Sequence, residues 1–168
     1  DAGDPVELAK AYVRQGADEL VFLDITATIE NRKTLAELVE RIAAEINIPF
    51  TVGGGIDTLD DVGILIKAGA DKVTVNSSAV KRPKLIPEIA GQFGSQCVVV
   101  AIDTKLIEDE WIVVVNGGRT PTLLRTVSWA RRLEELGAGE ILLTSMNNDG
   151  TRSGFSIGIT AEVCRNVN

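Results

Sequence analysis

Histidine is absent from all 168 residues, which removes the commonest general base and the commonest metal ligand in proteins. Any acid–base chemistry must therefore come from Asp, Glu, Lys, Tyr or Cys. The two cysteines, Cys97 and Cys164, are too few and too far apart for a disulfide framework or a metal cluster. We expect neither a metal nor a cofactor.

Long apolar runs and basic excess are missing as well. No run approaches the roughly 20 apolar residues of a membrane span, and no secretory leader is visible. The net charge of −7 argues against non-specific binding to nucleic acid. We expect a cytoplasmic protein with no membrane or nucleic-acid partner. Residues 1–168 show no linker or shift in composition, and we expect a single domain.

One phrase occurs three times: GADELVFLD from Gly16, GADKVTVNS from Gly69 and GAGEILLTS from Gly137. Each glycine is expected to end a helix in a left-handed conformation, and the apolar run that follows is expected to be a buried strand. The whole pattern predicts strands at 20–25, 50–52, 72–76, 97–103 and 141–144, and helices at 6–15, 35–46, 58–68, 83–93, 122–136 and 159–167. Residues 111–115 are predicted as a small extra hairpin strand. Such alternation predicts an α/β fold of parallel strands joined by right-handed crossovers.

Small polar residues and glycines follow each predicted strand, and parallel strands gather such ends at one rim. They are Asp24, Gly53–Gly55, Asn76–Ser78, Asp103 and Thr144–Ser145. VGGGI, NSSA and MNNDGTRSG (146–154) can each present backbone amides to a phosphate, or can simply form turns. Two such sites on one rim would hold a substrate with a phosphate at each end.

Asp103 ends the most apolar predicted strand. A partly desolvated carboxylate there can act as a general acid or base near neutral pH, or can brace a loop. At the opposite strand ends, Glu19, Lys72 and Glu140 follow their Gly-Ala phrases at the same offset. They are either a solvated rim or charges that converge and pair.

Five stretches together resemble the cyclase subunit of imidazole glycerol phosphate synthase: LVFLDITA (20–27), IPFTVGGGI (48–56), GADKVTVNSSAV (69–80), FGSQCVVVAIDTK (93–105) and GAGEILLTSMNNDGTRSG (137–154). The phosphoribosyl-formimino isomerase of the same pathway shares the glycine loops but matches LVFLDITA and LLTSMNNDG less well. The resemblance implies a lyase of histidine biosynthesis built on a (βα)8 barrel. That family closes an imidazole ring with ammonia from a glutaminase partner and splits a bis-phosphorylated substrate into imidazole glycerol phosphate and an aminoimidazole carboxamide ribotide.

Residue roles follow from the resemblance by position. Asp103 matches a catalytic aspartate. The other matches comprise one phosphate site (Gly54, Gly55, Asn76 and Ser77), part of a second (Asp149 and Gly150), rim residues near the substrate (Asp24 and Thr144), an ammonia gate (Glu19, Lys72 and Glu140) and a residue facing the glutaminase (Asp71).

A complete barrel needs roughly 250 residues, so we expect this chain to supply strands two to six of the parent barrel. The catalytic aspartate of the first strand would be missing, and the chain alone is expected to be weakly active or inactive. The open inner face, expected to carry Val21, Leu23, Val98, Val100 and Ile102, should drive self-association, pairing with a complementary fragment, or a flavodoxin-like closure by a helix. The alternatives to a cyclase segment are a non-catalytic phosphate-binding or assembly module, and the isomerase.

Overall fold

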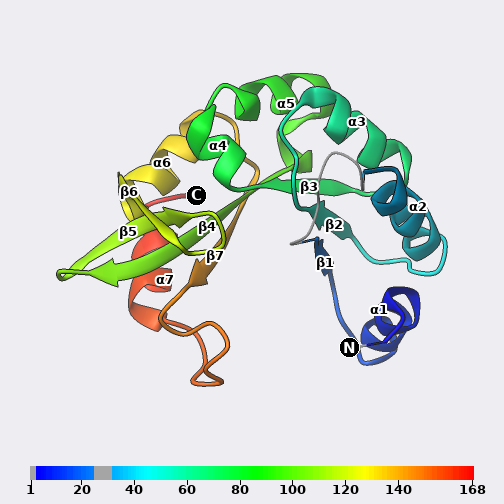
Figure 1. Cartoon of the computed structure of the whole chain (residues 1–168), viewed down its shortest axis with the longest axis horizontal. Coiled ribbons are helices and arrows are strands. Elements are labelled where there is room, and N and C mark those ends of the chain that lie inside the picture. Colours follow the sequence, from blue (N-terminus) through cyan, green and yellow to red (C-terminus); the bar gives the residue numbers. More distant parts are fainter. Residues whose placement is uncertain (1–2, 25–31) are drawn as a thin grey trace. The chain divides into compact units, whose positions relative to one another are not determined.

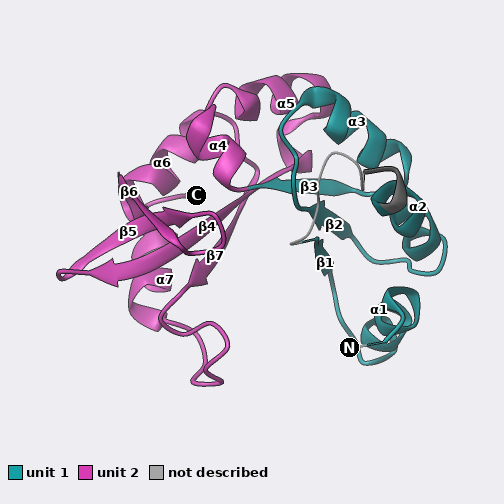
Figure 2. Cartoon of the chain, in the orientation of Figure 1, with its two compact units in different colours: residues 1–75 teal, residues 76–168 magenta. Residues whose placement is uncertain are grey.

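The structure is a computed structural model that describes residues 3–24 and 32–168, with residues 32–34 described by their backbone alone. It divides into two compact units, Asp1–Val75 and Asn76–Asn168, which Figure 2 colours separately. The single-domain organisation expected from the sequence stays a prediction.

Unit 1 alternates helices and strands throughout. In chain order it contains α1 (Pro5–Arg14), β1 (Leu20–Leu23), α2 (Arg32–Ala43), β2 (Phe50–Gly53), α3 (Leu59–Lys67) and β3 (Lys72–Val75) (Figure 1). The three strands are parallel, with β2 in the middle: Leu20 lies opposite Phe50, and Thr51 lies opposite Lys72. All four residues of the central strand β2 are buried, together with the apolar faces of the helices.

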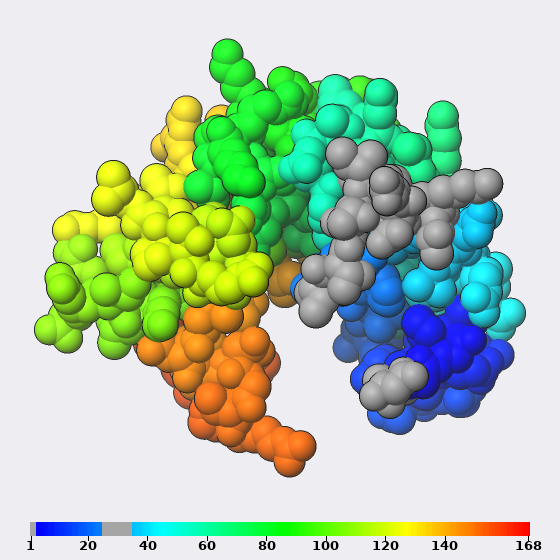
Figure 3. Space-filling model, in the orientation of Figure 1, coloured from blue at the N-terminus to red at the C-terminus, as the bar shows by residue number. Residues whose placement is uncertain are grey.

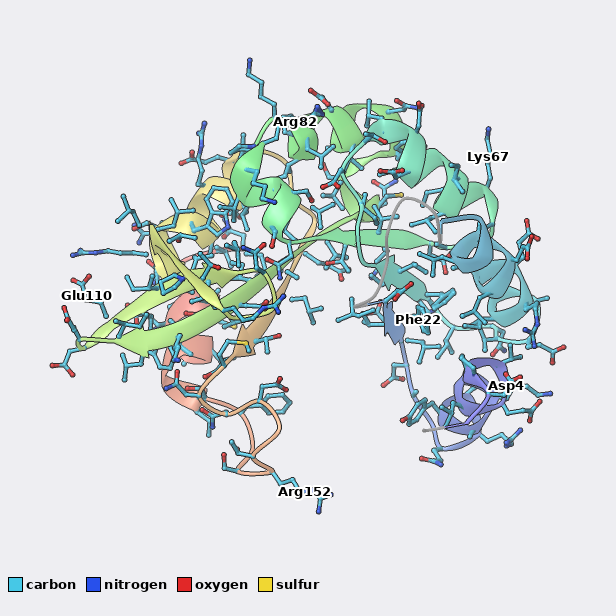
Figure 4. The ribbon with its side chains drawn as sticks, in the orientation of Figure 1. Asp4, Phe22, Lys67, Arg82, Glu110 and Arg152 are labelled. Carbon is cyan, nitrogen blue, oxygen red and sulfur yellow. The ribbon has the colours of Figure 1, made fainter. Side chains whose placement is uncertain are left out.

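Unit 2 combines a parallel strand pair with an antiparallel ribbon. It contains α4 (Ser77–Lys81), α5 (Leu85–Phe93), a short 3-10 turn η2 (Ser95–Cys97), β4 (Val98–Ile107), β5 (Glu110–Val115), β6 (Thr120–Arg125), α6 (Thr126–Glu135), β7 (Glu140–Ser145) and α7 (Ile157–Cys164). β4 pairs with β7 in parallel and with β5 in antiparallel fashion, and β5 pairs with β6. The ribbon β4–β5–β6 projects from the unit, with Glu110 near its tip (Figures 1 and 4). The predicted α/β architecture with parallel strands and flanking helices is therefore confirmed.

The repeated Gly-Ala phrase has one structural cause. At each copy the glycine amide donates to the carbonyl three residues back, and the following alanine amide donates to the carbonyl five residues back. The bonds are Gly16 to Val13 and Ala17 to Tyr12, Gly69 to Ile66 and Ala70 to Leu65, and Gly137 to Glu134 and Ala138 to Leu133. These are Schellman motifs, and their glycines have φ values of 91°, 105° and 97°. The predicted helix ends are confirmed, and each phrase delivers the chain into a strand.

Several predicted boundaries are wrong. Residues 122–125, predicted as the start of a helix, belong to β6, and α6 begins only at Thr126. β4 runs to Ile107, past its predicted end at Asp103. α2 begins at Arg32, three residues before its predicted start at Leu35. Ile25, the predicted end of the first strand, lies outside the described residues.

The inner face is only partly as expected. Val21 and Leu23 on β1 are 42% and 49% exposed, as predicted for that face. Val98, Val100 and Ile102, predicted on the same face, are at most 1% exposed. They alternate in phase with Thr104, whose hydroxyl oxygen lies 2.5 Å from that of Thr126 at the start of α6. These three residues therefore face the helices, and Val99, Ala101 and Asp103 occupy the opposite face of β4.

Candidate functional site

The candidate active site of unit 2 lies where β4 and β7 carry polar residues near their carboxyl ends. Asp103 on β4 and Thr144 on β7 are register partners in the parallel pair, so their side chains emerge on the same face. The Nδ2 atom of Asn76 donates a hydrogen bond of 3.0 Å to Oδ2 of Asp103. Thus three residues predicted for the site lie together in one unit.

The environment of the Asp103 carboxyl shifts its pKa. Burial raises its pKa above the usual value of 3.8, because the charged form loses contact with water. The hydrogen bond from Asn76 acts in the opposite direction, and the negative charge of Asp149 adds to the increase in pKa. A half-buried carboxyl with a raised pKa has greater proton affinity near neutral pH, which suits a general acid or base.

The loop after β7 forms one wall of a cavity of about 430 Å³. Thr144, Asp149 and Gly150, all predicted site residues, line this cavity, and Arg152 is the cation among its lining residues. Gly150 has a φ of 71°, which a turn of this kind requires. In the space-filling view this segment, coloured orange, lies at the surface of unit 2, and the Arg152 side chain extends from it (Figures 3 and 4). The cavity combines one carboxylate, one guanidinium and loop amides.

Ser77 is engaged by the ribbon, a contact that the sequence reasoning missed. Its hydroxyl oxygen accepts a 3.1 Å hydrogen bond from the backbone amide of Asn116. Asn116 and Gly117 both have positive φ, at 56° and 65°. An Asn-Gly pair after an apolar run is a strong hairpin signal, and it was the available clue to this turn.

In unit 1 the carboxyl ends of β1 and β2 bring Asp24 and the glycine run together. The Asp24 amide donates to the Gly53 carbonyl, 2.9 Å away. Gly54 has a φ of 116°, and a Cβ atom there would lie 2.0 Å from the Asp24 carbonyl oxygen. Only glycine permits this approach. Gly55 follows with a φ of 59°.

The amino ends of the unit 1 strands carry an ion pair. Lys72 Nζ lies 2.6 Å from Glu19 Oε1, with side-chain exposures of 14% and 47%. Glu19 directly precedes β1, and Lys72 is the first residue of β3. Because β2 lies between these two strands, the ion pair spans the start of β2. The Asp71 carboxylate accepts a 2.8 Å hydrogen bond from the Phe50 amide, which gives it a structural role in joining β2 to β3. Glu140 begins β7 in unit 2.

The described part of the chain contains neither a membrane-spanning helix nor a metal-binding cluster. None of its helices combines the length and apolar character needed to cross a bilayer. Its Cys, Asp and Glu side chains form no cluster of three suited to a metal ion.

Parallel strands, covering helices and polar carboxyl ends define a protein of the (βα)-barrel class, here a partial barrel. The chain belongs to the histidine biosynthesis protein family, whose model matches residues 1–168. This confirms the family resemblance predicted from the five motifs.

The chain is also similar in sequence to curated bacterial proteins. The imidazole glycerol phosphate synthase subunit HisF of Flavobacterium johnsoniae is 61% identical over 168 residues, which are 100% of this chain and 67% of the relative. The HisF proteins of a Hydrogenobaculum species and of Bacillus cereus strain G9842 are 59% and 58% identical, over 100% and 99% of this chain and 67% of each relative. The chain thus spans about two thirds of the length of these relatives.

Proposed function

We propose that this chain is a cyclase segment of imidazole glycerol phosphate synthase. The reaction closes an imidazole ring with ammonia and splits a bis-phosphorylated ribulosyl-formimino substrate into imidazole glycerol phosphate and an aminoimidazole carboxamide ribotide. The observation that carries the proposal is the half-buried Asp103 carboxyl, held by Asn76 beside Thr144. The HisF relatives support the choice of reaction.

Asp103 is the general acid or base in this proposal. Asp24 in unit 1 and Thr144 in unit 2 are each proposed to contact the substrate. Arg152, which lines the unit 2 cavity, supplies positive charge beside Asp149 and Gly150, where one phosphate would bind. The Gly150 amide has no acceptor among the described residues, so it is available to an anion.

For the second phosphate, the amides of Gly54 and Gly55 would form an anion site in unit 1, and those of Asn76 and Ser77 would form one in unit 2. Glu19, Lys72 and Glu140 would guide ammonia from a glutaminase subunit, and Asp71 would face that subunit. The Glu19–Lys72 ion pair favours the cyclase over the isomerase, because an isomerase conducts no ammonia. A non-catalytic phosphate-binding module shares the anion sites but requires no titrating carboxyl.

The proposal is tested by supplying the bis-phosphorylated substrate and an ammonium salt and measuring formation of the carboxamide ribotide. The assay is run with and without a peptide that supplies the first strand of a HisF relative. Asp103→Asn should lower the rate by about 10²-fold or more, because it removes the proton-transferring group. Asp109→Asn, the same chemical change at an exposed turn of unit 2, is the matched control.

Activity that survives Asp103→Asn would refute the assigned base. Phosphate binding without turnover in either assay would favour the non-catalytic module. Inorganic phosphate should slow hydrogen exchange of the amides at 53–55 and 76–78; unchanged exchange there would count against those anion sites.

A further inference from the structure

Asn76 is placed at a helix start, yet its side chain does not cap the helix. It is the N-cap residue of α4, the position at which asparagine usually accepts a hydrogen bond from an amide of the first turn. Its side chain makes no such bond. The Nδ2 atom instead donates to Oδ2 of Asp103, 3.0 Å away and 27 residues further along the chain.

The same side chain leaves a polar atom unsatisfied. Asn76 Oδ1 is buried and has no hydrogen-bond partner among the described residues. A buried, unpaired acceptor normally destabilises a fold, because it has lost its hydrogen bonds to water. Local stability therefore explains neither the lost cap nor the orphaned oxygen. What this orientation gains is the bond to Asp103.

We propose that Asn76 is a positioning residue for Asp103: its amide holds Oδ2 and leaves Oδ1 as the atom that exchanges a proton with the substrate. This rests on the proposed function, in which Asp103 transfers the proton. It also divides the roles of Asn76, whose backbone amide would serve the phosphate while its side chain serves the carboxyl.

The groups around Asp103 show how the hydrogen bond from Asn76 affects the protonation of this carboxyl. Thr144 is the register partner of Asp103 and carries no charge. Asp149, in the loop after β7, is the carboxylate whose field acts on Asp103. Lys105 follows two residues later on the same face of β4 and is exposed to solvent. Asn76 thus provides a neutral donor that favours the charged form of Asp103 against both burial and Asp149.

The test follows the Asp103 carboxyl carbon by NMR as the pH of the whole chain is varied. In the wild-type protein the Asn76 side-chain amide signals should titrate with the same midpoint as that carbon. In Asn76→Ala the midpoint should move to higher pH, because the charged carboxylate loses its donor. Asn166→Ala, the same chemical change at a residue outside the proposed site, is the matched control and should leave the midpoint unchanged.

The proposal would be overturned if the Asn76 side-chain amide signals did not shift as Asp103 titrates. An unchanged Asp103 midpoint in a folded Asn76→Ala protein would overturn it as well. If that variant does not fold, the wild-type titration alone decides. In the turnover assay, Asn76→Ala should lower kcat about tenfold or more, since misplaced catalytic groups lose rate steeply. Absence of turnover in the wild-type assay with the first-strand peptide would defeat the proposed function, whereas the NMR titration would still decide the positioning of Asp103.

Discussion

Substituting alanine for the three Schellman glycines should separate two contributions to the loss of stability, one from backbone conformation and one from side-chain packing. Gly16, Gly69 and Gly137 end α1, α3 and α6 with the same hydrogen bonds and similar φ values. Their surroundings differ. A Cβ atom would meet nothing within 4 Å at Gly16, would lie 3.4 Å from Ala90 Cβ at Gly137, and would lie 2.6 Å from Ala43 Cβ at Gly69.

The expected losses follow from those distances. Gly16→Ala carries only the cost of a left-handed alanine, about 1–2 kcal/mol in the free energy of unfolding. Gly137→Ala should cost about the same, because a separation of 3.4 Å is an ordinary contact. Gly69→Ala adds overlap with Ala43 at the end of α2, which typically costs about 1–3 kcal/mol more.

Urea unfolding followed by circular dichroism measures these losses, read from midpoints at constant slope. Gly16 and Gly69 both lie in unit 1, so their comparison is direct. Placing Gly69→Ala in an Ala43→Gly background should remove the overlap and return the cost of the alanine to that of Gly16→Ala. Equal losses for Gly16→Ala and Gly69→Ala, or no coupling between positions 43 and 69, would refute the packing argument.

Three further predictions concern charged and buried polar groups. Because burial raises the folded-state pKa of Asp103 above 3.8, its ionised form destabilises the fold above that raised pKa, and the cost vanishes below pH 3.8. Asp103→Asn should therefore raise the free energy of unfolding at pH 7 but not at pH 3, as compared by urea melts; equal effects at both values would contradict this. Thr104→Val should cost about 1–3 kcal/mol by stranding the Thr126 hydroxyl, and adding Thr126→Val should recover part of the loss; additive losses in the urea cycle would rule out the shared bond. A double-mutant cycle of Lys72→Met and Glu19→Gln should give a coupling of about 0.5–1 kcal/mol that weakens in 1 M salt, and a salt-independent value would exclude an ionic origin.

Much of the fold follows from local patterns in the sequence. The Gly-Ala phrases fixed three helix ends and the strands after them, because a Schellman motif is built from residues within one turn of each other. The ribbon was underestimated for an equally local reason. The β4–β5 turn uses Glu108 and Asp109, both with positive φ, where Asn or Gly would normally announce a hairpin. With that signal absent, β4 was predicted to end at Asp103. Residues 122–125 were assigned to the helix that follows them, although Asn116-Gly117 marks the β5–β6 turn.

It was predictable that Asp103, Thr144 and Asp149 lie on the same side of unit 2, because parallel strands present their carboxyl ends together. The partner of Asp103 was not. Asn76 lies 27 residues away, and asparagine at a helix start ordinarily caps that helix. The Lys72–Glu19 pair was anticipated as a possibility, and only the register across β2 shows that the two side chains meet.

The sequence by itself therefore determined the parallel α/β class, the helix ends and the chemistry available at each strand end, since these depend on residue type and short-range periodicity. The tertiary structure decided which face of β4 is buried, where the ribbon begins, and which hydrogen bond Asn76 makes. Those outcomes depend on competition between partners that are distant in the chain, and the relative free energies of such partners are set only when the strands pack.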